Sequence, residues 1–174
     1  RSYEGALLRV ENVDLKFVTK DSIFPSRRQY VRACNNISFE IFEGETFGLV
    51  GESGSGKSTI ARAITGLYPP DTGKIFFEGI DLTALKGEHE RRPLRRQMQM
   101  VFQNPYSSMN PRMKVRDIIA EPIRFHKLAS SESQIQGIVS DLLDHVGLGR
   151  GAGVKYPHEF SGGQRQRISI ARAL

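Results

Sequence analysis

The sequence predicts an α/β fold, and three observations carry that prediction. The N-terminal third contains short apolar runs and an alternating apolar–polar stretch, as half-buried strands do. A further apolar run leads straight into a glycine-rich segment and then a helical pattern. After Pro111 the apolar residues take the three- and four-residue spacing of amphipathic helices. At 174 residues, with 39% hydrophobic and 25% charged residues, the chain suffices for one globular domain.

The first third predicts strands separated by one long loop. Strands are expected at residues 7–10 and 13–17, which are rich in apolar residues, and at 37–42, where apolar and polar residues alternate. Residues 18–32 contain a proline and three arginines among many polar residues, so we expect a loop there.

The glycine-rich segment sits between a predicted strand and a predicted helix. A turn is expected at Gly44, and residues 46–50 after it are an apolar run with the length of a buried strand. Residues 51–59 follow directly, and helical periodicity begins at Lys57. The predicted apolar face of this helix consists of Ile60, Ala61, Ile64 and Leu67.

Later segments predict two more strands and a well-marked helix. Residues 68–73 are a turn signal before a strand at 74–78. The next strand, with alternating Met98, Met100 and Phe102, ends at residues 103–105. Ser131 and Gln134 have the Ser-x-x-Gln form of a capping box, and the helix that they start ends at Gly147. Its apolar stripe is Ile135, Ile138, Val139, Leu142, Leu143 and Val146.

Composition narrows the classes of protein. No segment approaches the ~18 apolar residues of a membrane helix. The single cysteine, Cys34, excludes an intrachain disulfide and is expected to be a buried thiol, and the four histidines lack metal-ligand spacing.

The chain starts without Met or a signal peptide, so we expect it to lack its true N-terminus and to work in the cytosol. The net charge of +6 leaves two interpretations of the basic run at 91–96, a solvated surface segment or a contact surface.

Residues 51–58 match the pattern G-x-x-x-x-G-K-[ST] in full. The glycines let backbone N–H groups approach phosphate oxygens, and the helix N-terminus adds positive potential at the same place. Lys57 can reach the β- and γ-phosphates, and the Ser58 hydroxyl can bind Mg²⁺. The candidate nucleotide-binding residues are Gly51, Glu52, Ser53, Gly54, Ser55, Gly56, Lys57, Ser58 and Thr59.

A second segment, residues 161–164 near the C-terminus, also has features that favour the binding of an anion. Ser161 is a good N-cap, and the glycines that follow expose the backbone at the start of a helix. This helix is predicted from the spacing of Ile168, Ala171 and Leu174. Taken alone, however, Ser-Gly-Gly-Gln commonly marks only a flexible helix start.

The two segments together resemble an ABC-type ATPase. Lys57, Gln103 and residues 161–167 occur in the order and spacing of that family's Walker A loop, Q-loop glutamine and signature motif. Phe160 stands where the signature motif normally has leucine. The resemblance covers essentially all 174 residues.

The sequence between these motifs resembles one subgroup. Residues 102–112, FQNPYSSMNPR, are similar to the FQDPxxSLNPR stretch of oligopeptide and dipeptide importer ATPases, and residues 121–124 and 156–167 fit the same group. Asn104 replaces the usual Asp and Met109 the usual Leu.

The resemblance implies a P-loop NTPase of the ABC type. Such a fold has a RecA-like core, an N-terminal antiparallel β subdomain and a helical subdomain, and here it would be incomplete at the C-terminus. Residues 1–103 would form the β subdomain and P-loop core, and 104–160 the helical subdomain. Residues 161–174 would hold the signature motif and the start of its helix.

The resemblance also implies ATP and Mg²⁺ as cofactors. In this family two subunits enclose two ATP molecules, and the Walker A loop of one subunit faces the signature motif of the other. Lys57 and Gln103 are then the candidate catalytic residues, and Ser58 and Gln103 the candidate Mg²⁺ ligands. Without the family, Gln103 would be interpreted as a buried structural amide. The contacts to ATP bound by the partner subunit would come from Ser161, Gly162, Gly163 and Gln164.

An aromatic residue near the N-terminus stacks on adenine in this family. Phe17 is the candidate because it ends the second predicted strand, and Phe24 and Tyr30 are rivals. A plain core role for Phe17 stays open.

The given sequence ends before two catalytic elements of the family. The Walker B strand carries a Mg²⁺-site Asp and a neighbouring Glu that activates water, and a switch histidine follows later. The resemblance therefore implies that residues 1–174 alone hydrolyse ATP negligibly. Because the Walker B strand is a central one, we also expect this polypeptide alone to be poorly stable or aggregated.

The expected function is the ATP-binding subunit of an ABC importer, peripheral on the cytoplasmic face of the membrane. Peptides are the favoured cargo, with nickel, glutathione-like compounds or sugars as alternatives. The implied partners are a second ATPase subunit, identical or different, transmembrane permease subunits and, indirectly, an extracytoplasmic substrate-binding protein, but no nucleic acid.

Two other classes of protein are alternatives: a non-transport ABC ATPase acting on nucleic acid or ribosomes, and an unrelated P-loop kinase or GTPase. The first is disfavoured because only a compact helical insertion fits between Gln103 and Ser161.

Overall fold

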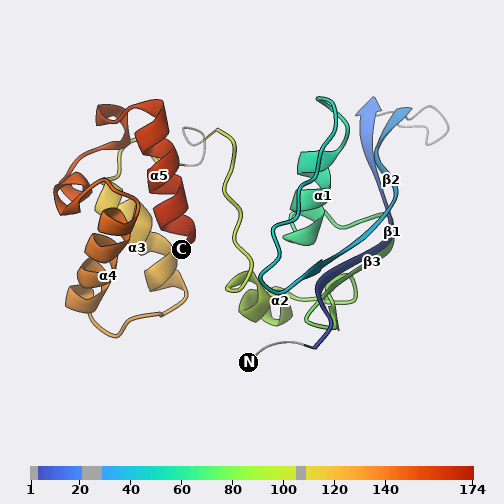
Figure 1. The fold of residues 1–174 in the computed structure, drawn as a ribbon, viewed down its shortest axis with the longest axis horizontal. Helices are drawn as coiled ribbons and strands as arrows, with labels where there is room; N and C mark the ends of the chain where they lie inside the picture. Colours follow the sequence, from blue (N-terminus) through green and yellow to red (C-terminus); the bar gives the residue numbers. More distant parts are fainter. Residues whose placement is uncertain (1–3, 21–28, 105–108) are drawn as a thin grey trace. The chain divides into compact units, whose positions relative to one another are not determined.

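A computed structural model describes residues 4–20, 29–104 and 109–174, and the chain divides into two compact units at Arg95. The sheet unit, Arg1–Arg95, holds the strands and the glycine-rich loop, and the helical unit, Arg96–Leu174, holds three longer helices (Figure 1). In the part of the chain that the structure describes, no helix is long and apolar enough to span a membrane.

The described strands of the sheet unit form one antiparallel sheet in the order β2-β1-β3-β4. The strands expected at 7–10, 13–17, 37–42 and 74–78 are present, and those of the N-terminal third are longer than predicted. Their pairing continues past Phe17 to Lys20, so the predicted loop at 18–32 is shorter than the sequence indicated, and residues 21–28 lie outside the described part. The strands are β1 (Ala6–Lys20), β2 (Gln29–Phe42), β3 (Thr72–Phe77) and β4 (Ile80–Asp81).

Two predicted strands, 7–10 and 13–17, are one strand with an irregularity between them. The register of β1 against β2 shifts between Val10 and Val13, and Asn12 has a φ of 48° in the left-handed region. Asparagine tolerates this conformation better than most residues. The Asn12 N–H donates to the Ser38 hydroxyl at 2.8 Å, which satisfies a backbone donor at the irregularity.

One face of the sheet packs on helix α1 (Lys57–Ile64). Cys34 is buried in this core, as predicted. The helix buries Ile60 and Ala63 rather than the whole predicted face, and Leu67 is 51% exposed because the helix ends before Gly66. The buried core of the sheet unit is Leu8, Val10, Val13, Leu15, Cys34, Ile60, Ala63 and Ile75.

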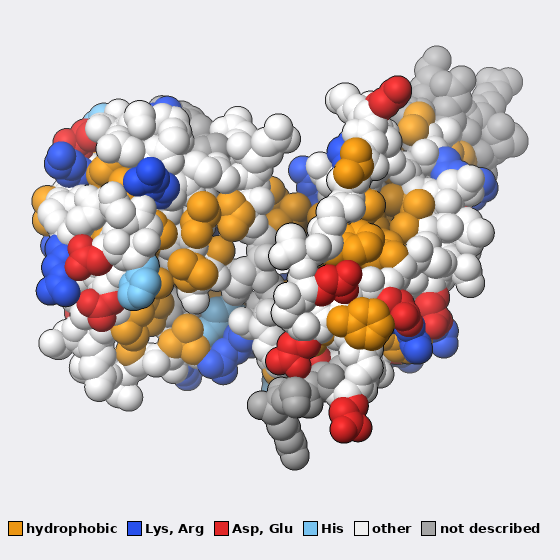
Figure 2. All heavy atoms as spheres, in the orientation of Figure 1, with side chains coloured by type: hydrophobic (Ala, Val, Ile, Leu, Met, Phe, Trp, Pro, Cys, Tyr) orange, Lys and Arg blue, Asp and Glu red, His pale blue; other side chains and the backbone are white. Residues whose placement is uncertain are grey.

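Two predicted strands, 46–50 and the one carrying Met98, Met100 and Phe102, are not strands in the structure. Neither segment joins the four-stranded sheet of the described residues, and a strand exists only where a neighbour completes its ladder. Their apolar side chains are consequently exposed or half-buried, with Val50 94% exposed. Hydrophobic side chains exposed on the sheet unit are visible in Figure 2.

Helix α2 (Glu88–Arg95) was not predicted and carries most of the basic run at 91–96. Its Leu94 is buried, whereas Arg92 and Arg96 are exposed. The Arg91 guanidinium donates to the Leu85 carbonyl at 2.7 Å, so part of the basic run contributes to local structure.

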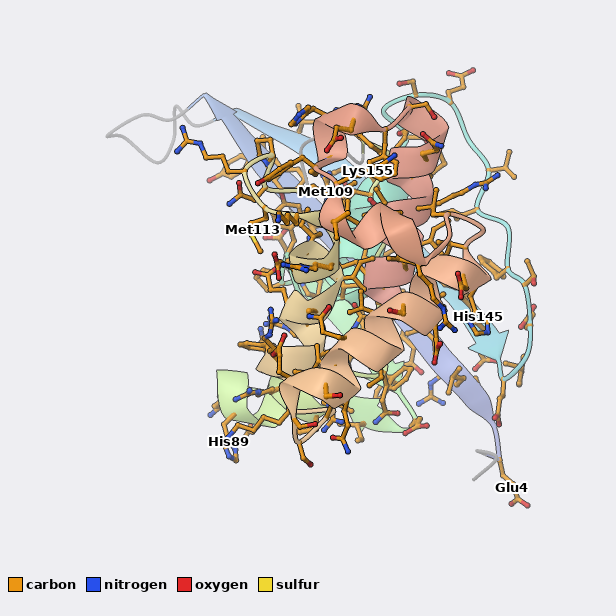
Figure 3. The ribbon with its side chains drawn as sticks, turned by 90° about the vertical axis from the view of Figure 1, so that its left-hand side faces the viewer. Glu4, His89, Met109, Met113, His145 and Lys155 are labelled. Atoms are coloured by element: carbon orange, nitrogen blue, oxygen red, sulfur yellow. The ribbon has the colours of Figure 1, made fainter. Side chains whose placement is uncertain are left out.

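The helical unit packs α3 (Val115–Phe125), α4 (Glu132–His145) and α5 (Gly162–Ala173) around one core (Figures 1 and 3). Short 3₁₀ helices, η2 (Arg150–Val154) and η3 (Pro157–Glu159), connect α4 to α5. The buried core is Met109, Val115, Ile118, Ile119, Ala120, Ile123, Ile135, Val139, Leu143, Ala152, Phe160, Ile168 and Ala171.

The predicted apolar faces of α4 and α5 are mostly correct. In α4 the stripe is narrower than predicted, since Ile138 is 37% exposed, and Gly147, with a φ of 70°, follows the helix end. In α5 Ile168 and Ala171 are buried, but Leu174 lies beyond the helix and is 76% exposed.

Candidate functional site

The glycine-rich loop lies against strand β2 at Gly56. A Cβ added to Gly56 would come within 2.1 Å of the Ala33 carbonyl oxygen, and the residue has a φ of 93°. Both observations require glycine here, since an L side chain would clash with backbone and strain the residue. The Cys34 thiol lies 3.9 Å from the Gly56 carbonyl on the same side. The loop is therefore seated directly on the sheet.

Lys57 is held inside the loop that precedes it. Its Nζ donates hydrogen bonds to the carbonyls of Gly51, at 2.7 Å, and Glu52, and to the Ser55 hydroxyl at 3.0 Å. The loop thus curls around a positive charge.

The N-terminus of α1 adds to the positive potential. Gly56 is the N-cap and no side chain caps it, and the first turn holds no acidic residue. The first helical hydrogen bond runs from the Ile60 N–H to the Gly56 carbonyl, so the amides of residues 57–59 precede the helix's own ladder. The Ser58 side chain is exposed at this end. The loop amides, the helix N-terminus and Lys57 thus lie together in the arrangement that is typical of a P-loop and that suits an anion chemically.

The second predicted motif starts helix α5 with a full capping box. The Ser161 hydroxyl accepts from the Gln164 N–H at 3.3 Å, and the Gln164 side chain accepts from the Ser161 N–H at 3.0 Å. Gly162 and Gly163 are exposed at this helix start. Phe160, which stands at the usual leucine position, is buried in the helical core, so the larger side chain is accommodated.

The capping box predicted at Ser131 differs in geometry from the one at Ser161. The Ser131 hydroxyl accepts from the Gln134 N–H at 3.3 Å, but the Gln134 side chain accepts from the N–H of Ser130 rather than of Ser131. The helix start is capped as predicted, with the return hydrogen bond shifted by one residue.

The remaining predicted residues divide between the two units. Phe17 lies in the sheet unit with the glycine-rich loop, and Gln103 and residues 161–164 lie in the helical unit. Gln103 is exposed, which contradicts its interpretation as a buried structural amide. Phe17 is half-buried against the sheet core, Tyr30 is 54% exposed, and Phe24 lies outside the described residues. Among the described residues no group of three or more His, Cys, Asp or Glu side chains could hold a metal ion.

Sequence reasoning missed the contact that Tyr68 makes with Phe17. Its ring contacts that of Phe17 edge to face, with centroids 5.2 Å apart. The residue belongs to a predicted turn, and no local pattern indicates a contact across 51 positions of the sequence.

A family model for the ABC transporter matches residues 34–174. The chain is 53% identical to the oligopeptide transport ATP-binding protein OppF of Streptococcus mutans, over 97% of this chain and 52% of that protein. It is 48% identical to the dipeptide transport ATP-binding protein DppF of Lactococcus lactis, over 97% and 52%. It is also 45% identical to the glutathione import ATP-binding protein GsiA of Salmonella paratyphi A, over 97% and 27%. The chain thus spans about half the length, or less, of these relatives.

Solved structures show the same fold. The dimeric ATP-binding cassette MJ0796, bound to ADP and Pi, superposes with a TM-score of 0.82 at 28% identity, over 96% of this chain and 68% of that chain. The cbiO1 protein from Clostridium perfringens, part of the transporter complex cbiONQ, superposes with a TM-score of 0.76 at 24% identity, over 98% and 62%.

Proposed function

Because this chain belongs to the ABC transporter family, we propose that it is the ATP-binding subunit of an importer that couples ATP binding and hydrolysis to the uptake of peptides. The relatives named for oligopeptide and dipeptide transport support peptide cargo, since they match 97% of the chain. Glutathione is a second candidate because GsiA is 45% identical. Nickel remains a further alternative from the sequence resemblance.

The observation that carries this proposal is the geometry of the loop at residues 51–59. Gly56 seats the loop on β2, and Lys57 is positioned within it by three loop oxygens. ATP phosphates would accept hydrogen bonds from the loop amides and from Lys57. Phe17, half-buried at the edge of the same sheet core, would stack on the adenine.

Mg²⁺ would be held by the exposed Ser58 hydroxyl, by phosphate oxygens and by Gln103. Hydroxyl, amide and phosphate oxygens are the ligands that this ion prefers. The ion would neutralise charge that develops on the transferred phosphoryl group. Gln103, which is exposed, would also orient the attacking water.

A second subunit would complete each ATP site. The exposed glycines and the capped N-terminus of α5 offer backbone N–H groups to an anion, so Ser161, Gly162, Gly163 and Gln164 would contact ATP held by the partner. The similar MJ0796 cassette, solved as a dimer bound to ADP and Pi, supports a nucleotide-binding dimer. The ATPase pair would lie on the cytoplasmic face of the membrane against permease subunits, with an extracytoplasmic substrate-binding protein as indirect partner.

Hydrolysis by the whole protein would need the Walker B carboxylates in addition. Residues 1–174 offer no residue that matches the water-activating glutamate of the family, so this polypeptide alone should bind ATP and hydrolyse it negligibly. A sustained ATPase rate from the pure 174-residue polypeptide, comparable with that of the full-length protein, would refute this part of the proposal.

The function is tested by peptide uptake in cells whose own copy of the gene is deleted. The full-length protein should restore uptake of a labelled tripeptide, and the Lys57→Ala variant should not, because the loop loses its central positive charge. Lys86→Ala removes an exposed lysine of the same unit and should restore uptake fully. Unchanged uptake with Lys57→Ala at equal protein level would contradict the proposal.

A further inference from the structure

Tyr68 contacts the candidate adenine-stacking residue from a segment outside the nucleotide motifs. Its ring and that of Phe17 lie 5.2 Å apart between centroids, with an interplanar angle of 78°. An edge-to-face pair of this kind uses one face of one ring and leaves the other ring faces available for stacking. We propose that Tyr68 positions Phe17 for nucleobase recognition, so that base affinity depends on the turn after α1. This inference rests on the proposed function.

The turn that carries Tyr68 is fastened to the strand that carries Phe17. The Asp71 N–H donates to the Asp14 carbonyl at 2.9 Å, and the Lys16 N–H donates to the Asp71 carboxylate at 2.6 Å. The Thr72 hydroxyl donates to the Asp14 carboxylate at 3.0 Å. These three hydrogen bonds attach the turn to β1 independently of the ring contact itself.

Tyr68 is also fastened to the helix that begins at the glycine-rich loop. The N–H groups of Leu67 and Tyr68 donate to the Arg62 carbonyl at 2.8 and 3.3 Å. The Arg62 guanidinium lies 6.0 Å from the centre of the Tyr68 ring, within the range of a cation–π contact. One residue therefore joins the end of α1 to the aromatic residue on β1.

The spacing along β1 suits a nucleotide. Leu15 pairs with Cys34, beside the Ala33 carbonyl on which Gly56 rests. Phe17 lies two residues farther on, about 7 Å along the strand, and packs against the same core. A nucleotide with phosphates at the loop can therefore place its base near Phe17. Tyr68, at 37% exposure, lies at the edge of this region and is not part of the phosphate site.

The experiment compares a complete nucleotide with its phosphate chain alone. The full-length protein is titrated calorimetrically with the non-hydrolysable ATP analogue AMP-PNP and with inorganic tripolyphosphate. We expect Tyr68→Leu to weaken AMP-PNP binding about fivefold, the range of an aromatic pair, and to leave tripolyphosphate binding unchanged. Tyr68→Phe keeps the ring and should bind AMP-PNP as the wild type does. In a Phe17→Leu background, Tyr68→Leu should have no further effect, because it acts through Phe17.

Phe42→Leu is the matched control. This exposed aromatic residue lies at the opposite end of the β1–β2 pair, opposite Ala6, and its replacement should change neither affinity. An equal loss of both affinities in Tyr68→Leu, or an additive loss in the double variant, would overturn the positioning role. Tighter AMP-PNP binding would also overturn it, since Tyr68 would then obstruct the base. If the wild type binds neither ligand, the proposed function itself fails.

Discussion

Gly56 is the residue at which the glycine-rich loop and the sheet come closest. Its positive φ and the nearby Ala33 carbonyl leave no room for a side chain. The turn preceding α1 and strand β2 therefore approach each other through their backbones rather than through side-chain packing.

We expect Gly56→Ala to destabilise the protein and to abolish nucleotide binding. The left-handed conformation costs roughly 1–2 kcal/mol for an L residue, and relief of the clash must move the loop away from β2. Urea unfolding and AMP-PNP titration of the full-length protein measure the two effects. Gly48→Ala is the control, because an added Cβ there meets nothing within 4 Å. Wild-type nucleotide affinity in Gly56→Ala would contradict the close approach.

Cys34 should react slowly with alkylating reagents in the folded protein. Burial, and secondarily the charge of Asp14, raise the pKa of its thiol above the ordinary value of 9.0. At pH 8 the reactive thiolate is then rarer than in an unfolded chain, and it is shielded as well. Iodoacetamide labelling followed by mass spectrometry should be about tenfold slower than in urea.

The same shift gives a pH dependence of stability. The unfolded thiol loses its proton at lower pH than the folded one, so the contribution of Cys34 is fully present below the ordinary pKa and is lost as the pH rises from there through the higher folded pKa. Cys34→Ala should remove this decline from the alkaline limb of the stability curve. Equal labelling rates with and without urea would refute the raised pKa and the burial together.

At the scale of elements, α4 contains an identifiable weak position. Gly137 lies in the middle of the helix, exposed, and an added Cβ meets nothing within 4 Å. Gly137→Ala should therefore stabilise the protein by about 1 kcal/mol, since alanine has the higher helix propensity. Thermal unfolding followed by circular dichroism measures the change.

Gly153→Ala provides the contrast within the same unit. Its Cβ would lie 3.3 Å from the Arg116 side chain in a buried position of η2, so we expect a loss of stability. If both alanine variants changed stability by the same amount and sign, local packing would not distinguish the two sites.

Elements defined by local patterns were predictable from sequence. The glycine-rich loop, the caps at Ser131 and Ser161 and the buried face of α5 all follow from residues within a few positions of one another. Helix α2 could not be predicted from the sequence. It consists mostly of charged residues and contains Pro93, and Leu94, a buried apolar residue, is too little by itself to give a helical apolar pattern.

Elements defined by distant partners were predicted less well. Residues 46–50 have the composition of a buried strand, but strand formation depends on a neighbour that composition does not specify. The contact between Phe17 and Tyr68 likewise depends on the turn's attachment through Asp71. Of the candidate site, the loop around Lys57 and its place before a helix could thus be predicted from neighbouring residues, whereas the contact between Phe17 and Tyr68 could not.

At the scale of the whole molecule, the two units have separate cores, and the sheet unit exposes an apolar segment. Phe47, Leu49 and Val50 are 40%, 43% and 94% exposed. Adjacent exposed apolar residues favour association.

We expect the isolated 174-residue polypeptide to be poorly stable and to aggregate. Size-exclusion chromatography with light scattering and scanning calorimetry measure this. Val50→Asp should lower the aggregated fraction without loss of secondary structure, because the side chain is almost fully exposed. A sharp cooperative melt of a monomeric wild-type polypeptide would contradict the expectation.

The three oxygens that hold Lys57 have a consequence for the speed of nucleotide capture. The loop keeps its shape through its own hydrogen bonds, so an arriving phosphate exchanges partners with an ammonium group that is already in place. If nucleotide binds as proposed, we therefore expect capture without a conformational search, at a rate that falls as salt is added. The lifetime of the complex, in contrast, depends on how readily the loop oxygens of Gly51, Glu52 and Ser55 take the ammonium group back.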